Sequence, residues 1–152
     1  MANKPGIYWH LDGFDGFDKR IDFDKRKIRA AMRRAGAIVR TRARADLASG
    51  TSSGAGYPAV RKGNLRRSIR VKVSRSGFLV RVAPYKTAAM GAHFYPAYLH
   101  YGVRAKTSAH HSAVGGWRIE PRENFMADAL QESAGQVESV LRAAFESAFA
   151  IR

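Results

Sequence analysis

The residues whose types could support chemistry are three histidines and two glutamates: His100, His110, His111, Glu120 and Glu123. Imidazole and carboxylate groups together can bind a metal ion or exchange protons. Their spacing matches no known site, and the chain lacks H-E-x-x-H, G-x-S-x-G, a phosphate-binding loop and any cysteine. Adjacent histidines in a polar loop are more often ordinary surface residues. The sequence therefore predicts a protein that is not an enzyme and that needs no metal or cofactor.

Positive charge is the second chemical feature. The 152 residues include 27 lysines and arginines against 12 acidic residues, a formal net charge of +15. Such a field attracts nucleic acid, an anionic membrane surface or an acidic protein face, and composition does not choose among them. No apolar stretch approaches the ~20 residues that span a bilayer and no signal-peptide core is present, so no membrane partner is expected. The lack of cysteine agrees with a reducing compartment.

A long helix is predicted over residues 24–49. Apolar residues recur at three- and four-residue steps from Ile28 to Leu47, an aspartate can cap the start, and Gly50 ends the pattern. Four arginines fall on the opposite face with almost no acids beside them: Arg29, Arg33, Arg40 and Arg44. A solvated helix face and a surface that contacts a polyanion both explain such a row.

A basic hairpin is predicted over residues 67–83, because apolar and polar side chains alternate on both sides of an SRSG turn. One face of the pair should be buried and the other basic. The inward positions are Ile69, Val71, Val73, Phe78, Val80 and Val82. The basic residues at the start and on the outer face of the hairpin are Arg66, Arg67, Arg70 and Lys72.

Four further segments complete the chain. Residues 1–22 are predicted to be an acidic, aromatic arm, whose glycines disfavour a helix. An aromatic helical turn begins near Pro96 and ends at Gly102, residues 103–118 are predicted as a long loop, and a second long helix is predicted over 122–149. Residues 1–152 are therefore predicted to be one α+β domain, in which a small antiparallel sheet packs against two long helices.

Three motifs, in order, resemble a known family. "KGNLRRSI" is similar to a "TGxLrxSI" motif that leads into a hairpin, "YPAYLHYGV" to a "YAxyvEfGT" segment, and "PRENFMADAL" to an "xPFlrPAl" start of a final helix. "HLDGFDGFDKRI" resembles the usual opening of the same proteins. The family is the minor tail-component proteins of tailed bacteriophages, of the tail-completion or neck type found in siphophages. His100 stands where the family usually has Glu, and Val103 where Thr is common.

The resemblance implies a structural virion protein, made in the host cytoplasm and built into the tail and neck. It implies a six-fold ring at the head-proximal end of the tail that joins head to tail. The partners would be other neck and tail proteins and, in the channel, genomic DNA. A cyclic ring needs two different complementary patches on each subunit. The arm, with Phe14 and Phe17, is expected to contact basic residues of the next copy; the interface residues expected besides the arm are Arg66, Arg67, Arg70, Lys72, Arg104 and Lys106.

The alternative is a basic nucleic-acid-binding module that uses the arginine row of the first helix. Basic residues with aromatic neighbours can hold phosphates and stack on bases. No zinc finger, helix-turn-helix or RNP-type strand motif accompanies them. The charge thus supports contact with a polyanion without supplying a means of reading sequence.

Overall fold

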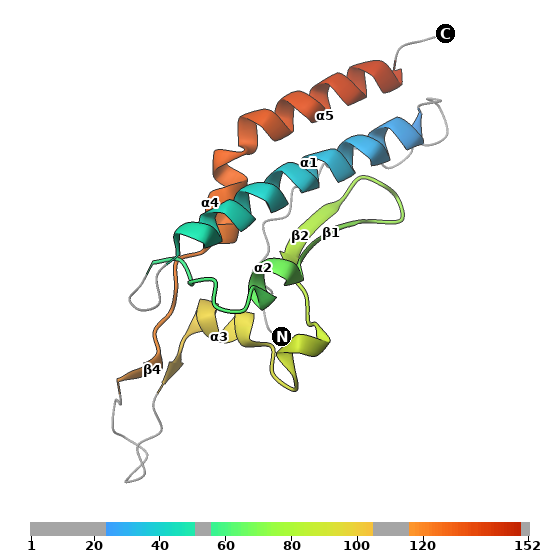
Figure 1. Ribbon diagram of the computed structural model, residues 1–152. Helices are drawn as coiled ribbons and strands as arrows, with labels where there is room; N and C mark the ends of the chain where they lie inside the picture. Colours follow the sequence, from blue (N-terminus) through green and yellow to red (C-terminus); the bar gives the residue numbers. More distant parts are fainter. Residues whose placement is uncertain (1–23, 51–55, 105–115, 150–152) are drawn as a thin grey trace.

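The computed structural model describes residues 24–50, 56–104 and 116–149, and it shows an α+β fold (Figure 1). The long helix α1 (Lys25–Asp46) lies between two partners. On one side is the antiparallel hairpin of β1 (Ile69–Val73) and β2 (Val80–Pro84), and on the other is α5 (Ala134–Phe149). The predicted fold class, helices packed against a small antiparallel sheet, is confirmed.

α1 begins at an aspartate cap. The Asp24 carboxylate accepts hydrogen bonds from the backbone N–H groups of Arg26 at 3.0 Å and Lys27 at 3.3 Å, which satisfies two donors that a helix leaves unpaired at its start. The helix continues into a single 3-10 turn, η2 (Leu47–Ser49), and ends at Gly50. Its inward face carries Ile28, Ala31, Met32, Ala35, Gly36, Val39, Ala43 and Asp46.

The hairpin has the register that its alternation predicts. Val71 lies opposite Val82, and Val73 lies opposite Val80. Ile69, at the start of β1, is fully buried, and these four valines are half-buried. The short helix α2 (Asn64–Ser68) leads directly into β1. The alternating side chains therefore divide the hairpin into one face on α1 and one face in solvent.

The second long helix, predicted over 122–149, is two helices in the structure. α4 (Phe125–Glu132) is capped by the Asn124 side chain, which accepts from the N–H of Ala127 at 3.3 Å. α4 ends at the buried Ser133, and α5 begins at the next residue. Both helices contact α1, and Figure 1 shows α4 crossing α1 whereas α5 runs alongside it. The prediction of one continuous helix is therefore wrong at Ser133.

The long loop predicted over 103–118 is also corrected at both of its ends. β3 (Val103–Arg104) pairs antiparallel with β4 (Trp117–Ile119), with Val103 opposite Ile119. The Arg104 guanidinium lies 4.0 Å from the centre of the Trp117 ring, a cation–π contact that joins the two strands. Upstream, α3 (Tyr95–Tyr101) is followed by Gly102, where the sequence predicts the aromatic turn to end.

Apolar packing forms two clusters along α1. One cluster joins the end of α1 to α2, β1 and α4, and its buried members are Ala43, Leu47, Leu65, Ile69, Phe125 and Ala129. The other joins the start of α1 to α5, with Ile28, Met32 and Ala148 at its centre and hairpin residues against it. A short 3-10 turn, η3 (Ala88–Met90), lies between β2 and α3. Among the described residues, no helix combines the length and apolarity needed to cross a membrane.

Candidate assembly surface

The outer face of the hairpin carries three exposed cationic side chains, Arg70, Lys72 and Arg81. Lys72 and Arg81 lie directly opposite each other in the ladder, where like charges repel. The Lys72 Nζ atom lies 4.1 Å from the centre of the Tyr85 ring, a cation–π contact that holds this charge above the sheet. Within the described residues, none of the three cations forms an ion pair with a carboxylate. We call these three residues the basic hairpin face.

The surroundings of the basic hairpin face do not offset its charge. No acidic residue lies between Leu47 and Ile119, whereas twelve lysines and arginines do. That stretch supplies α2, both hairpin strands, α3 and β3. The described carboxylates lie on α1, α4, α5 and the segments that lead into α1 and α4: Asp24, Asp46, Glu120, Glu123, Asp128, Glu132, Glu138 and Glu146. The hairpin and the elements next to it in sequence therefore carry positive charge without acidic residues of their own to offset it.

The other predicted interface residues lie on α2 and β3. Arg66 and Arg67 are exposed on α2, and the Arg67 guanidinium donates to Lys62 O and Asn64 Oδ1, both at 2.8 Å. Arg104 is exposed on β3 against Trp117. The structure thus places Arg66, Arg67, Arg70 and Lys72 on consecutive elements and Arg104 on a separate ribbon. The remaining predicted residues, Phe14, Phe17 and Lys106, lie outside the described residues.

The four arginines of α1 do not form one exposed row. Arg33 is exposed, but Arg29, Arg40 and Arg44 are half-buried. Arg44 donates from Nε to the backbone carbonyl of Arg66 and from Nη2 to that of Ile69, each at 3.1 Å. Desolvation, followed by the charges of Arg40 and Arg66, lowers the pKa of Arg44. Arg44 therefore links α1 to the start of β1, because a planar guanidinium can donate to two carbonyls at once.

Arg29 packs on the turn of the hairpin. Gly77 in that turn is buried and has φ of +92°, a conformation that favours glycine. A Cβ atom at Gly77 would also overlap the Arg29 side chain. The glycine of the SRSG turn therefore serves both the turn geometry and the close approach of α1.

A cluster of titratable side chains, which the sequence did not indicate, fixes the end of α1. The buried Asp46 pairs with Arg42 at 3.0 Å, and Arg42 also pairs with Glu132 of α4. The Tyr57 hydroxyl donates to Asp128 Oδ2 at 2.9 Å, and this bond raises the pKa of Tyr57 to about 12. Desolvation raises the pKa of Asp46 even though the charge of Arg42 opposes it. The only signal available in the sequence was the i, i+4 spacing of Arg42 and Asp46.

The residues considered first for chemistry do not gather in the described structure. His100 is exposed on α3 and packs edge-on against Tyr101, with ring centres 4.7 Å apart. Glu120 and Glu123 are exposed in the segment before α4. His110 and His111 lie outside the described residues. In the part of the chain that the structure describes, no group of three or more His, Cys, Asp or Glu side chains could hold a metal ion.

The motifs that resemble the phage family lie at three structural junctions. "KGNLRRSI" contains α2 and the first residue of β1, "YPAYLHYGV" contains α3 and the start of β3, and "PRENFMADAL" contains the cap and first turns of α4. Comparison with protein-family models, with curated proteins and with solved structures finds no match for this chain.

Proposed function

We propose that this protein is a structural virion component of a tailed bacteriophage. In this proposal it is a tail-completion or neck protein that forms a ring at the head-proximal end of the tail and joins head to tail. The observation that carries the proposal is the basic hairpin face, whose charges are not offset by any described carboxylate. The ordered resemblance of the three motifs supports the same function.

The basic hairpin face has the properties of a docking surface. Its cations project from a two-stranded ladder that packs on α1, so their positions are set by rigid elements. The opposed pair of Lys72 and Arg81 repels in the isolated subunit, and an anionic partner would relieve that repulsion. Complementary charge also steers association and fixes the register of the partners. In a ring, an acidic face of a neighbouring protein or the DNA in the channel supplies the negative charge.

Charge reversal on this face tests the proposal. We expect the Arg70→Glu, Lys72→Glu double variant to fold, because both side chains are exposed. The yield of infectious particles should fall about a hundredfold or more, since losing one partner of a hydrogen-bonded interfacial charge pair costs about 2–5 kcal/mol. The matched control is Arg26→Glu, Arg33→Glu, which reverses two exposed charges of α1. Normal titres from the hairpin variant would show that the face has no role in assembly.

A second candidate is a basic nucleic-acid-binding module, favoured by the stretch without acids between Leu47 and Ile119. In that case phosphates would contact the basic hairpin face rather than the α1 row, in which Arg33 is the exposed member. Three neutralised phosphates would give a log affinity that falls with log salt with a slope of about −2.7 for duplex DNA. Fluorescence anisotropy with a labelled duplex measures this slope. Absence of binding at about 0.1 M salt would exclude the candidate.

A further inference from the structure

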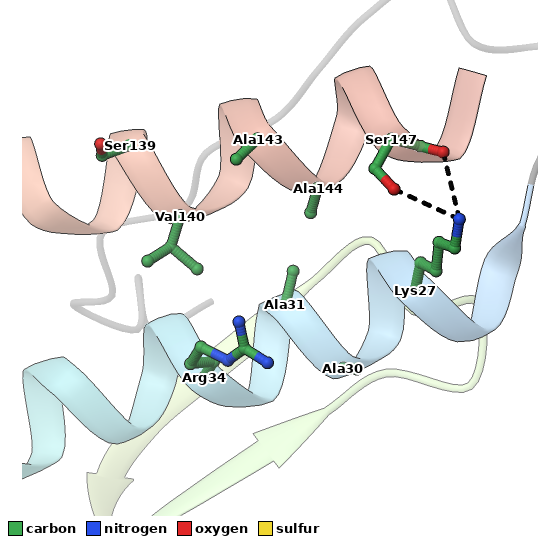
Figure 2. A pocket seen from close by; sticks show the side chains of 9 residues that line it. All are labelled: Lys27, Ala30, Ala31, Arg34, Ser139, Val140, Ala143, Ala144 and Ser147. Atoms are coloured by element: carbon green, nitrogen blue, oxygen red, sulfur yellow. Dashed lines mark hydrogen bonds between the residues drawn. The ribbon is translucent and has the colours of Figure 1, made fainter. Parts of the chain in front are cut away.

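A groove lies between α1 and α5, with a volume of about 510 Å³ (Figure 2). Lys27 stands at one end, where its Nζ atom donates to the backbone carbonyl of Ser147 at 3.3 Å and contacts the Ser147 hydroxyl at 3.2 Å. Figure 2 shows the side chains of Arg34 from α1 and Val140 from α5 pointing into the space between the helices. The groove thus lies beside the packed contact of the two helices, in which Ile28, Met32 and Ala148 are buried.

The lining of the groove selects for one kind of occupant. Its walls are mainly apolar and are built from small side chains, among them Ala30 and Ala143, together with Val140. Its charged members, Lys27 and Arg34, are both cationic, and no carboxylate lines it. Large apolar side chains would remove the walls from water, and acidic groups beside them would meet the two cations.

We propose that the groove binds residues 12–23 of the same chain. This segment, "DGFDGFDKRIDF", alternates Phe14 and Phe17 with aspartates and holds four of the twelve acidic residues of the protein. Its aromatic rings suit the apolar walls, and its carboxylates suit Lys27 and Arg34. The segment thus supplies the large apolar side chains and the negative charges that the groove residues lack.

The position of the segment in the chain allows this docking. The segment joins α1 at Asp24, three residues before Lys27. An extended chain spans about 3.3–3.6 Å per residue, so the seven residues from Phe17 to Asp24 reach about 23–25 Å. The stretch of α1 from Lys27 to Arg34 rises only about 10 Å. Tethering raises the effective concentration of the segment at the groove, which favours its own chain over a second copy. The inference does not depend on the proposed phage function, and it places Phe14 and Phe17 on their own chain, whereas the resemblance implies a contact with the next copy.

Disulfide trapping tests the docking, because the chain has no cysteine of its own. The full-length variant Gly16→Cys, Ala143→Cys places one thiol between the two phenylalanines and one in the groove, where Ala143 is exposed. The control pair, Gly16→Cys with Lys72→Cys, places the second thiol on the hairpin. We expect the groove pair to oxidise at least about tenfold faster, and as a monomer, because docking holds its thiols together. Equal rates, or cross-linked dimers at low micromolar protein, would overturn the proposal.

Two kinds of substitution test whether the segment binds the groove through opposite charges and apolar contact. Arg34→Glu in the groove pair should slow disulfide formation several-fold, whereas Arg33→Glu, an exposed neighbour that does not line the groove, should leave it unchanged. Phe14→Ser with Phe17→Ser should also slow it several-fold, because the apolar contact is lost. Equal effects of Arg34→Glu and Arg33→Glu, or no effect of the two Phe substitutions, would contradict the assignment.

Discussion

The two sides of α1 use small residues in opposite ways. Toward the hairpin, a Cβ atom at Gly36 would overlap Val71 and would lie 2.8 Å from Val80 Cγ2, so the absent side chain permits close contact. Toward α5, Ala31 and Ala144 point toward each other in a groove of about 510 Å³ (Figure 2). The difference comes from the opposing residues, which are branched valines at Gly36 and alanines in the groove, beside which Leu141 and Phe145 pack on the rest of α1. A small residue in a helix pattern therefore marks either close approach or open space, and only the facing element decides which.

Placing a carboxylate on each side of α1 should give the largest difference in unfolding free energy. Val71→Asp puts a carboxylate against α1 at Gly36, and we expect a loss of about 3 kcal/mol or more of unfolding free energy. Val140→Asp puts the same group in the groove beside Arg34 and should change stability by less than about 1 kcal/mol. Circular dichroism with urea denaturation measures both. Similar losses in the two variants would remove the distinction between the close contact at Gly36 and the groove.

A smaller contrast concerns the arginines of α1. Arg44→Ala should cost about 2 kcal/mol, because the carbonyls of Arg66 and Ile69 lose a charged donor in a half-buried place. Arg34→Ala, which removes an exposed side chain that lines the groove, should fall within about 0.5 kcal/mol of the wild type. Arg44→Lys keeps the positive charge but lacks the planar guanidinium that donates to two carbonyls. It should recover only part of the lost stability. Urea midpoints rank the stabilities of the three variants. An Arg44→Ala variant with unchanged stability would show that the hydrogen bonds of Arg44 to the start of β1 are dispensable.

Two glycines in helices give the next test. Gly36→Ala gains about 1 kcal/mol of helix propensity. The new methyl group would also push Val71 and Val80 away from α1, which costs about 1–3 kcal/mol. We expect a net loss of about 1 kcal/mol. Gly135→Ala near the start of α5 meets nothing within 4 Å and should stabilise the protein by about 0.4–1 kcal/mol. Thermal unfolding should move in opposite directions for the two variants, and a stabilising Gly36→Ala would mean that the hairpin side is not tightly packed.

The smallest expected effect is a pH dependence at the end of α1. The bond to Asp128 raises the pKa of Tyr57 to about 12, whereas an unfolded tyrosine titrates near pH 10. The hydrogen bond of the neutral Tyr57 hydroxyl should stabilise the fold fully below about pH 10. This contribution to stability should be lost as the pH rises toward 12. Phenolate absorbance, taken as the difference from Tyr57→Phe, measures the titration. Asp128→Asn should return the pKa toward 10, and an unchanged titration in that variant would exclude the assigned cause.

The hairpin could be predicted from sequence because its period is short and repeated. Alternation from Ile69 to Val82 separates an inward from an outward face, and the SRSG turn places the two strands in register. The start of α1 and the end of η2 were also visible, since Asp24 and Gly50 flank an apolar pattern with helical spacing. These elements depend on local spacing alone.

Other features depend on contacts that spacing does not encode. Ser133 interrupts a helical pattern without a proline, and β3 and β4 are too short to show a period. A helical wheel places Arg44 opposite the apolar stripe, but its long side chain reaches back to the backbone of β1. The basic hairpin face was predicted, whereas its isolation from described carboxylates and the groove between α1 and α5 required the structure.

The position of this chain in phage particles tests the proposed assembly role most directly. Particles would be purified from a phage whose genome encodes the protein and reconstructed by electron cryomicroscopy without imposed tail symmetry. The proposal predicts a ring at the head-proximal end of the tail into which α1, the hairpin, α4 and α5 fit, with the basic hairpin face against a neighbouring subunit or the channel. Complete, infectious particles that lack this chain would contradict it.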